Sequence, residues 1–462
     1  MFFSHGRRAR LPLLLSRLVC DAIVLFHFSM EAEYDALIIG GGPGGSTAAS
    51  YLAKAGRRVL VLEKEHFPRF HIGESLLPYN RRIFDEIGVL PKLEAAGLTK
   101  KYGAQFHLGN GSKALSLCFR NGRFTREPMA YQVERSMFDH LLLQHAASIG
   151  ADVRQGWTVT RSVTNAERVE VEARGENGAS QSFRAKFLID ASGRGNFTGN
   201  QQGLREIDPN LKKVAIFAHF CGVKLDAGDK RGDTVIIRLE KKWFWIIPLT
   251  TEKVSVGLVM DREELQRARG EPEEVFDATW RASLPLRERM DEARLVSQIY
   301  TTSDFSYKNR TFVGQRLLRV GDAAGFMDPI FSSGVYLACY SAKLAAEVVG
   351  RALQGGGDGS RDMRRYEKKV YRAMEFYWDM VNGFYTTPFM EMFMSPRNKF
   401  SLPSAITAVL AGELEGGWKM SWRMKVFFWL VKLHARWPLV PRISFCANEV
   451  PSEKREAVEL PA

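Results

Sequence analysis

The chain has 462 residues, of which 45% are hydrophobic, and its 65 basic and 52 acidic side chains give a formal net charge of +13. This composition predicts a globular protein with a large core divided among two or three domains. The positive excess is spread along the chain rather than collected in an arm, which excludes a typical nucleic-acid-binding protein and favours an anionic ligand or partner. The five cysteines show no metal-binding spacing, so we expect no metal site, reduced thiols and a cytoplasmic location.

The first 30 residues contain an apolar run from Leu11 to Phe28 that follows several arginines. Pro12, Arg17 and Asp21 interrupt this run, and a membrane span needs about 20 mostly apolar residues. No small-residue cleavage site follows it, as a secretory signal would require. We therefore expect residues 1–30 to be a non-essential extension, with no transmembrane segment.

Residues Tyr34 to Glu63 have the pattern of a complete βαβ dinucleotide-binding unit, with glycines at the positions G-x-G-x-x-G. The first glycine makes the tight turn, the second lets backbone N–H groups approach a pyrophosphate, and the third lets the helix pack on the strand. Glu63 lies where a carboxylate would accept hydrogen bonds from ribose hydroxyls. The parts are the strand Tyr34–Ile39, the glycines Gly40, Gly42 and Gly45, the helix Ala48–Ala55 and the strand Arg58–Leu62.

Residues Lys101 to Leu108 alternate between two kinds of side chain, which predicts one half-buried strand. The apolar face holds Tyr102, Ala104, Phe106 and Leu108, and the polar face holds Lys101, Gly103, Gln105 and His107. Helices are expected on either side of this strand, from about Asn80 to Ile87 and from Ser136 to Ile149.

The chain from Lys213 onward predicts a second sheet, because four β-rich runs are separated by turn residues. A buried strand at Arg316–Val320 then returns the chain to the nucleotide fold, and long helices follow at Ser333–Gln354 and Arg361–Phe384. The four β-rich runs are Val214–Val223, Thr234–Leu239, Trp243–Leu249 and Val254–Met260. The expected divisions are the extension 1–30, a nucleotide-binding part 31–200, a β-rich substrate domain 201–310, a second nucleotide-binding part 311–355 and a helical region 356–462.

Three separated segments each run from a buried strand into glycine: the glycine loop, Phe187–Gly193 and Leu318–Ala324. In open α/β sheets, ligands bind at the carboxyl ends of such strands. These segments resemble the superfamily of FAD-containing monooxygenases and halogenases over roughly residues 34–350. The resemblance implies FAD, and no second glycine motif offers a place for NADPH. The cofactor-binding residues that we expect are Gly40, Gly42, Pro43, Gly45, Ser46, Glu63, Arg135, Asp322, Gly334 and Val335.

Residues Trp243 to Pro248 match the pattern W-x-W-x-I-P. With these residues, nearly the whole chain resembles the flavin-dependent halogenases. In that family the tryptophans separate the flavin from the organic substrate, which suppresses direct monooxygenation. The alternative is an ordinary aromatic core strand, with Trp243 and Trp245 on one face and Phe244 on the other. The barrier residues implied by the resemblance are Trp243, Trp245, Ile247 and Pro248.

Lys101 begins a stretch that matches the family pattern K-x-x-x-x-F, ending at Phe106. The resemblance implies that this catalytic lysine either becomes a haloamine or hydrogen-bonds hypohalous acid. The two roles require opposite protonation states, since a haloamine forms on neutral lysine and hydrogen bonding uses the ammonium form. A solvated surface lysine is the alternative. His107 is a further candidate for acid/base work on the substrate, and a purely structural histidine is its alternative.

Residues Asp328 to Val335 resemble the family turn D-P-x-x-S-x-G, which holds the halide through backbone N–H groups. A helix N-terminus suits an anion because its first amides are unpaired and its dipole is positive there. We therefore expect Ser332, Ser333 and Gly334 to hold chloride or bromide. The tryptophan-specific branch of the family carries a glutamate where this chain has Phe331. That departure favours the branch that acts on phenols or pyrroles and leaves the substrate acid/base residue unassigned.

The sequence thus predicts a doubly wound, FAD-binding Rossmann-type α/β fold with an inserted antiparallel β-sheet and a C-terminal helical region. The expected function is a halogenase of secondary metabolism that uses O2, a halide and reduced FAD from a separate flavin reductase. Its expected partner is an aromatic small molecule, free or tethered to an acidic carrier protein. The alternatives are a single-component FAD/NADPH aromatic monooxygenase, a polyprenyl reductase on a membrane surface and a flavin-binding protein without chemistry. The basic aromatic stretch Trp418–Phe445 fits an active-site cover, a carrier-docking helix or a membrane-surface helix.

Overall fold

The computed structural model describes residues 33–268, 270–303, 306–396, 400–414, 417–445 and 456–459. The described residues from Tyr34 onward form one compact unit. The predicted extension at residues 1–30 lies outside the described ranges, as do Cys20 and Cys446. None of the helices in these ranges combines the length and apolar character that a membrane span requires.

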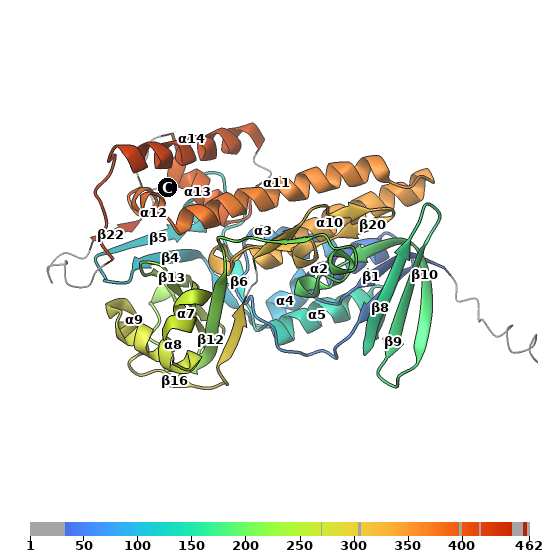
Figure 1. Cartoon of the computed structure of the whole chain (residues 1–462), viewed down its shortest axis with the longest axis horizontal. Coiled ribbons are helices and arrows are strands. Elements are labelled where there is room, and N and C mark those ends of the chain that lie inside the picture. The colour runs from blue at the N-terminus through green and yellow to red at the C-terminus, as the bar shows by residue number, and fades with distance from the viewer. Residues whose placement is uncertain are drawn as a thin grey trace, which may run out of the picture. The chain divides into compact units, whose positions relative to one another are not determined.

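An eight-stranded sheet carries the nucleotide-binding motif, with strand order β19-β20-β10-β1-β2-β7. Strands β8 (Trp157–Thr164) and β9 (Val169–Gly175) extend it beside β10 (Figure 1), and β19 (Val313–Gly314) is its edge strand beside β20. Strands β2 and β20 and the last four residues of β1 and of β10 are buried, and they are rich in Val, Ile and Leu, as parallel strands covered on both faces are. The parallel strands are β1 (Tyr34–Ile39), β2 (Val59–Glu63), β7 (Asp152–Gln155), β10 (Ser180–Asp190) and β20 (Leu317–Arg319).

The carboxyl ends of three parallel strands meet at one edge of this sheet. Ile39 of β1 is in register with Asp190 of β10, and Asp190 is in register with Arg319 of β20. The segments that follow these strands, separated by almost 300 residues of sequence, therefore lie next to one another. This arrangement confirms the predicted Rossmann-type fold and the convergence of its three strand ends.

A nine-stranded sheet forms the second layer, with strand order β16-β12-β15-β14-β13-β4-β5-β22 and with β17 beside β12. Its short outer strands are β16 (Arg294–Leu295), β17 (Tyr300–Ser303) and β22 (Glu456–Glu459). Neighbouring strands from β12 to β15 are antiparallel, as predicted. Two earlier segments extend this sheet, because β4 pairs in parallel with β13 and β5 pairs with β4. The strands named here are β4 (Gly103–Leu108), β5 (Lys113–Cys118), β12 (Lys213–Cys221), β13 (Thr234–Arg238), β14 (Trp243–Pro248) and β15 (Val254–Asp261).

The prediction of one half-buried strand from Lys101 to Leu108 is wrong. Strand β3 (Thr99–Lys101) pairs with β6 (Ala130–Gln132) in a separate two-stranded sheet, and the chain leaves that sheet at Tyr102 before β4 begins. The predicted polar face is also buried, with Lys101 only 2% exposed and Gln105 only 4%. The alternation of apolar and polar residues predicted that one face of the strand is exposed, whereas the structure covers both faces with other parts of the protein.

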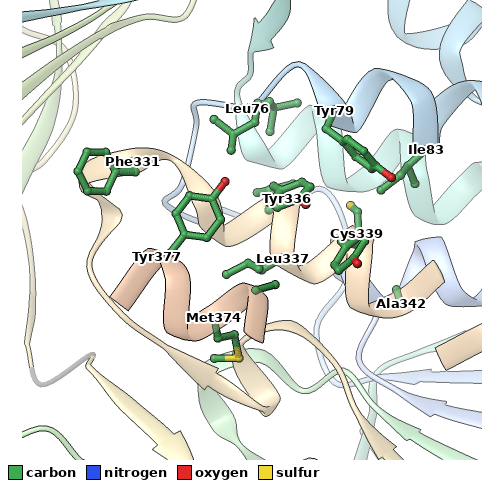
Figure 2. Packing of buried hydrophobic residues seen from close by; sticks show 14 of the residues in the cluster. Leu76, Tyr79, Ile83, Phe331, Tyr336, Leu337, Cys339, Ala342, Met374 and Tyr377 are labelled. Atoms are coloured by element: carbon green, nitrogen blue, oxygen red, sulfur yellow. The ribbon is translucent and has the colours of Figure 1, made fainter. Parts of the chain in front are cut away.

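Helices make up most of the C-terminal region. The helices α10 (Ser333–Gly355) and α11 (Ser360–Phe384) pack side by side (Figure 1), and α10 also packs on α2 (Pro43–Lys54) of the glycine motif. Figure 2 shows the apolar cluster between them, in which Tyr336 and Leu337 of α10 face Tyr377 and Met374 of α11. The predicted long helices are therefore confirmed, and they are held by burial of large apolar side chains.

A buried carboxylate joins the last helices. Glu391 of α12 (Thr387–Phe393) lies 2.7 Å from His434 Nε2 of α14 (Gly417–Arg436) and 2.8 Å from Arg442 Nη1. The backbone N–H of Ile443 donates to the other oxygen of Glu391 at 3.0 Å. Because Glu391 is 1% exposed, these partners supply the hydrogen bonds that a buried charge requires. On its outer side α14 exposes Trp418, with 78% of its surface accessible.

Candidate active site

The glycine loop between β1 and α2 has the geometry of a phosphate cradle. Gly40 has φ of +97°, which a side chain would strain. A Cβ on Gly45 would lie 1.9 Å from the carbonyl oxygen of Gly40, so only glycine lets α2 approach the loop this closely. Helix α2 begins after Gly42 without a side-chain cap, and its first amides are therefore available to an anion. Ser46 Oγ donates to the carbonyl oxygen of Gly41 at 2.8 Å and supports the loop from behind.

Glu63 ends β2 and lines the same cavity as the loop. Its Oε2 accepts the backbone N–H of Gly41 at 2.6 Å, and its Oε1 accepts the N–H of Glu65 at 2.9 Å. The carboxylate thus fixes the glycine loop and keeps lone pairs that can accept from hydroxyl groups.

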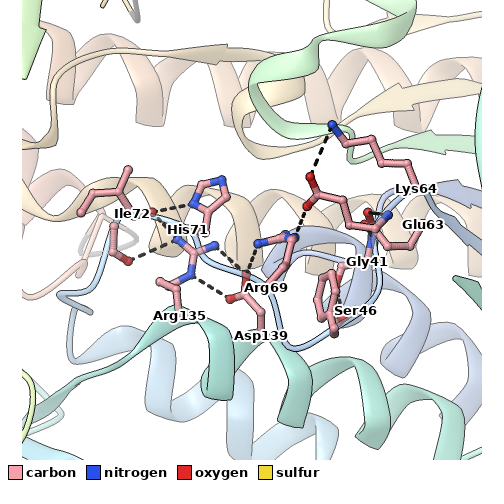
Figure 3. Close-up of polar contacts among 12 residues, drawn as sticks. Gly41, Ser46, Glu63, Lys64, Arg69, His71, Ile72, Arg135 and Asp139 are labelled. Carbon is pink, nitrogen blue, oxygen red and sulfur yellow. Dashed lines mark hydrogen bonds and ion pairs between the residues drawn. The ribbon is translucent and has the colours of Figure 1, made fainter. Parts of the chain in front are cut away.

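A buried arginine anchors the segment that follows β2 (Figure 3). Arg135 donates to both oxygens of Asp139, at 2.8 and 3.0 Å, and also to the carbonyl oxygen of Ile72 at 2.7 Å. Arg69 reaches Asp139 at 3.3 Å from the other side. The bidentate, charge-assisted hydrogen bonds between Arg135 and Asp139 offset the cost of burying the two charged side chains. These contacts fix the loop Lys64–Pro78, whose residues Arg69 to Ser75 line the cavity.

One large cavity, of about 840 Å³, connects the glycine loop to the second sheet. Ligand sites usually measure about 300–1,000 Å³, so this volume suits a large ligand. The predicted site residues in its wall are Gly40, Gly42, Pro43, Glu63, Arg135, Trp243, Trp245, Ile247, Asp322, Ser332, Gly334 and Val335. Within the described part of the chain, the other predicted site residues lie outside this wall: Gly45, Ser46, Lys101, Pro248 and Ser333.

A second helix N-terminus faces the cavity at the turn after Asp328. Asp328 Oδ1 accepts the N–H of Ile330 at 3.1 Å, and Ser332 adopts the left-handed conformation with φ of +55° just before α10 begins. No side chain of the described residues caps α10, so the amides that begin this helix suit an anion. Nearby, burial raises the pKa of the Asp322 carboxyl to about 6, against the attraction of Arg135.

The tryptophan strand β14 separates two cores. Trp243 and Trp245 face the cavity, whereas Phe244 packs in the core on the other side of the sheet. The Trp245 ring lies across Gly257, where a Cβ would come within 2.1 Å of it. Trp245 Nε1 donates to Ser255 Oγ at 3.0 Å. Strand β14 is therefore an aromatic core strand, and its tryptophans also form a fixed wall of the cavity.

Lys101 lies directly behind the cavity wall. Its Nζ donates to Ser75 Oγ at 2.9 Å and to the carbonyl oxygen of Leu76 at 3.2 Å. Ser75 lines the cavity and also exchanges a hydrogen bond of 2.9 Å with Thr234 Oγ1. Burial lowers the pKa of Lys101 from 10.5 to about 7, despite the opposing attraction of Asp233. The side chain is thus neither solvated nor permanently charged, and Ser75 is its contact with the cavity.

The segment that holds Ser75 also contributes a carboxylate that the sequence did not indicate. Glu74 lines the cavity and its Oε1 lies 2.7 Å from His219 Nε2. Its partner is 145 residues away, which is why no local pattern could reveal the pair. His107, the candidate acid/base residue from the sequence, is not among the described residues that line the cavity. Burial lowers the pKa of His107 to about 4, so it is neutral at neutral pH.

Phe331 takes the position expected for a carboxylate in the tryptophan-specific branch. Its side chain is 3% exposed and packs edge-on against Phe384 at a centroid distance of 5.9 Å. Figure 2 shows the Phe331 ring at the end of the turn that precedes α10. An apolar contact thus replaces the acid at this point.

These features together fit FAD. Two uncapped helix N-termini and the Glu63 carboxylate face one cavity within the described residues, as a dinucleotide with two polar ends requires. Residues 33–376 match the family model described as FAD binding domain. The fold and the site therefore define a flavoprotein with FAD as its cofactor.

Known relatives narrow this class. The chain is 31% identical over 412 residues to a 1H-pyrrole-2-carbonyl-[peptidyl-carrier protein] chlorinase of Pseudomonas fluorescens, a match that covers 84% of this chain and 91% of the relative. The structure of the flavin-dependent brominase Bmp2 is similar with a TM-score of 0.78 and 28% identity, over 88% of this chain and all of that one. A flavoprotein/dehydrogenase from Cytophaga hutchinsonii has a TM-score of 0.80 and 27% identity, over 88% of this chain and 99% of that one. The chain belongs to the flavin-dependent halogenases.

Proposed function

We propose that this halogenase attaches chlorine or bromine to an electron-rich phenol or pyrrole, with Lys101 as its catalytic residue. Bound as reduced flavin, FAD supplies with O2 the oxidising power that converts a halide to an electrophilic halogen. The glycine loop, Glu63 and Arg135 hold the cofactor. Ser332, Ser333 and Gly334 hold the halide, since the N-terminus of α10 offers unpaired amides there.

The tryptophan strand keeps the substrate away from the flavin. Trp243, Trp245 and Ile247 line the cavity that would hold the flavin, and Pro248 ends the strand. These side chains are buried, and the close packing of the core holds them in place. The oxidised halogen must then pass along the protein to the substrate, and Ser75 gives it access to Lys101.

Lys101 suits this role because of its protonation. With a pKa of about 7, the neutral and ammonium forms coexist near neutral pH. The neutral amine can accept a halogen, and the ammonium form can hydrogen-bond hypohalous acid. An exposed lysine would be almost wholly protonated at this pH.

The substrate class follows from Phe331. A phenol or pyrrole activates its own ring through the ring oxygen or nitrogen, so the site needs no carboxylate at this position. We infer that the substrate is carried by an acidic carrier protein, which the net charge of +13 would attract. We further infer that a separate flavin reductase delivers the reduced cofactor, and that the reaction takes place in the cytoplasm as part of secondary metabolism.

The observation that carries the proposal is the buried Lys101 held against the cavity wall by Ser75. The test supplies reduced FAD through an external reductase, with O2, bromide or chloride, and a panel of free and carrier-bound phenols and pyrroles. Mass spectrometry should detect the halogen isotope pattern in the product. Hydroxylated product without halide, or NADPH consumption without the reductase, would instead identify a single-component monooxygenase.

Two lysine variants test the catalytic assignment. Lys101→Met should bind FAD and oxidise the reduced flavin but form no halogenated product. Lys100→Met, which alters the exposed neighbour on the same strand, should halogenate as the unmodified enzyme does. Normal halogenation by Lys101→Met would contradict the role of Lys101 while leaving the reaction class in place.

A further inference from the structure

Tyr385 joins two walls of the cavity that are far apart in sequence. It follows the last residue of α11 and lies outside the cavity wall in the described residues. Its hydroxyl accepts the indole N–H of Trp243 at 2.9 Å and donates to Asp328 Oδ2 at 2.7 Å. One hydroxyl therefore uses both its donor and an acceptor site.

The chain of contacts continues to the turn before α10. Asp328 accepts from Tyr385 with one oxygen and from the N–H of Ile330 with the other. Trp243 and Ile330 both line the cavity, and Ser332 follows two residues later in the same wall. The hydroxyl of Tyr385 thus fixes the tryptophan strand relative to the turn that begins α10.

The surroundings hold the Tyr385 ring in one place. Lys213 Nζ lies 3.7 Å from the ring centroid and is itself paired with Asp261 at 2.7 Å. Arg238 Nη2 donates to the backbone carbonyl of Tyr385 at 3.4 Å. Asp328 is 2% exposed, so removing its partner would leave a buried carboxyl with an unmet hydrogen bond, which is costly.

The protonation of the pair agrees with this hydrogen-bond direction. Burial, with the neighbouring Asp328, raises the pKa of the Tyr385 phenol well above its ordinary value. Burial likewise raises the pKa of Asp328 to about 6. At neutral pH the phenol of Tyr385 therefore stays protonated. It is the donor of the hydrogen bond to Asp328, whose carboxyl group is mostly ionised.

We propose that Tyr385 is a positioning residue for halogenation, which holds the tryptophan barrier and the halide-binding turn at a fixed separation. This inference rests on the proposed function, because that function assigns the barrier and the halide to these two walls. It gives the C-terminal helical region a part in the chemistry. A looser separation would let the oxidant escape to water before it reaches Lys101.

Tyr385→Phe tests the proposal, since it removes the hydroxyl and keeps the ring. Tyr377→Phe is the matched control, because Tyr377 is a buried tyrosine of α11, the helix that Tyr385 follows, and its hydroxyl donates to the Val409 carbonyl at 2.9 Å. The assay measures halogenated product formed per reduced flavin oxidised, together with hydrogen peroxide release. Tyr385→Phe should lower the product yield by about tenfold and raise peroxide release, as loss of a charge-assisted hydrogen bond allows. Tyr377→Phe should retain the yield.

A second measurement separates this inference from the proposed function. Titration of bromide into the FAD-bound protein, followed by the flavin absorbance, should show weaker halide binding in Tyr385→Phe than in the unmodified protein or in Tyr377→Phe. This readout needs no turnover, so it holds even if no substrate in the panel is halogenated. Equal yields and equal halide affinities in all three proteins would overturn the positioning role. Equal losses in both variants would also overturn it, since they would reflect stability alone.

Discussion

Replacing Lys101 by methionine should stabilise the protein at neutral pH while it abolishes halogenation. Methionine has a similar length and carries no charge, so it fits the buried position without the cost of burying an ammonium group. Burial lowers the pKa of Lys101 from 10.5 to about 7. Below about pH 7 Lys101 is protonated in both the folded and the unfolded protein, and the unfolding free energy is lowered by the full amount that corresponds to this pKa shift. The cost falls as the pH rises, and above 10.5 it is absent because the unfolded chain is also neutral.

The magnitude follows from the displacement of the pKa. At about 1.4 kcal/mol for each pKa unit, the change from 10.5 to about 7 corresponds to roughly 5 kcal/mol below neutral pH. The variant loses the hydrogen bonds to Ser75 and Leu76, each of which contributes about 1 kcal/mol. We therefore expect a net gain of about 2–3 kcal/mol at pH 7 and a net loss above about pH 9.

The assay is urea unfolding at several pH values between 6 and 10, with every sample saturated with FAD because the cofactor itself stabilises the fold. Lys100→Met is the control, and its unfolding free energy should follow that of the unmodified protein at each pH. A difference between Lys101→Met and the unmodified protein that does not change with pH would refute the reasoning. So would a loss of stability at pH 7.

Three further substitutions test other parts of the site and its support. Gly45→Ala should lower the unfolding free energy by about 3 kcal/mol and abolish FAD retention during purification, because its Cβ would lie 1.9 Å from the Gly40 carbonyl oxygen. Arg135→Lys should weaken FAD binding, measured by fluorescence titration, and cost about 3 kcal/mol, because lysine cannot pair with both oxygens of Asp139. Glu391→Gln should cost about 2–3 kcal/mol in urea unfolding and leave the flavin absorbance spectrum unchanged, since Glu391 is not in the cavity wall.

The nucleotide-binding part could be predicted from sequence because its constraints are local. Gly40 and Gly45 are required by a turn and a close helix contact within one stretch of chain, and the apolar runs beside them match the buried strands. The three strand ends at the sheet edge were also predictable, since parallel strands share one direction. Local patterns of this kind reflect backbone geometry that the chain imposes on itself.

The rest depended on contacts that no local pattern encodes. Alternation from Lys101 to Leu108 predicted a polar face, whereas another layer of the protein covers it. Ser75 and Tyr385 were not predicted as site residues, because each acts through a partner more than 20 residues away. A lysine pKa near 7 likewise results from burial, and burial is a property of the assembled fold.

The break at Tyr102 has a consequence for engineering the enzyme. Lys101 is held by its pairing with β6 and by Ser75 and Leu76, whereas the next strand, β4, belongs to the nine-stranded sheet. Strand β4 itself is paired on both sides, with β13 and β5, and the ring centroid of Phe119, directly after β5, lies 5.7 Å from Lys101 Nζ. Changes that are to leave the lysine in place should therefore be confined to the turn between the two strands, residues 109–112.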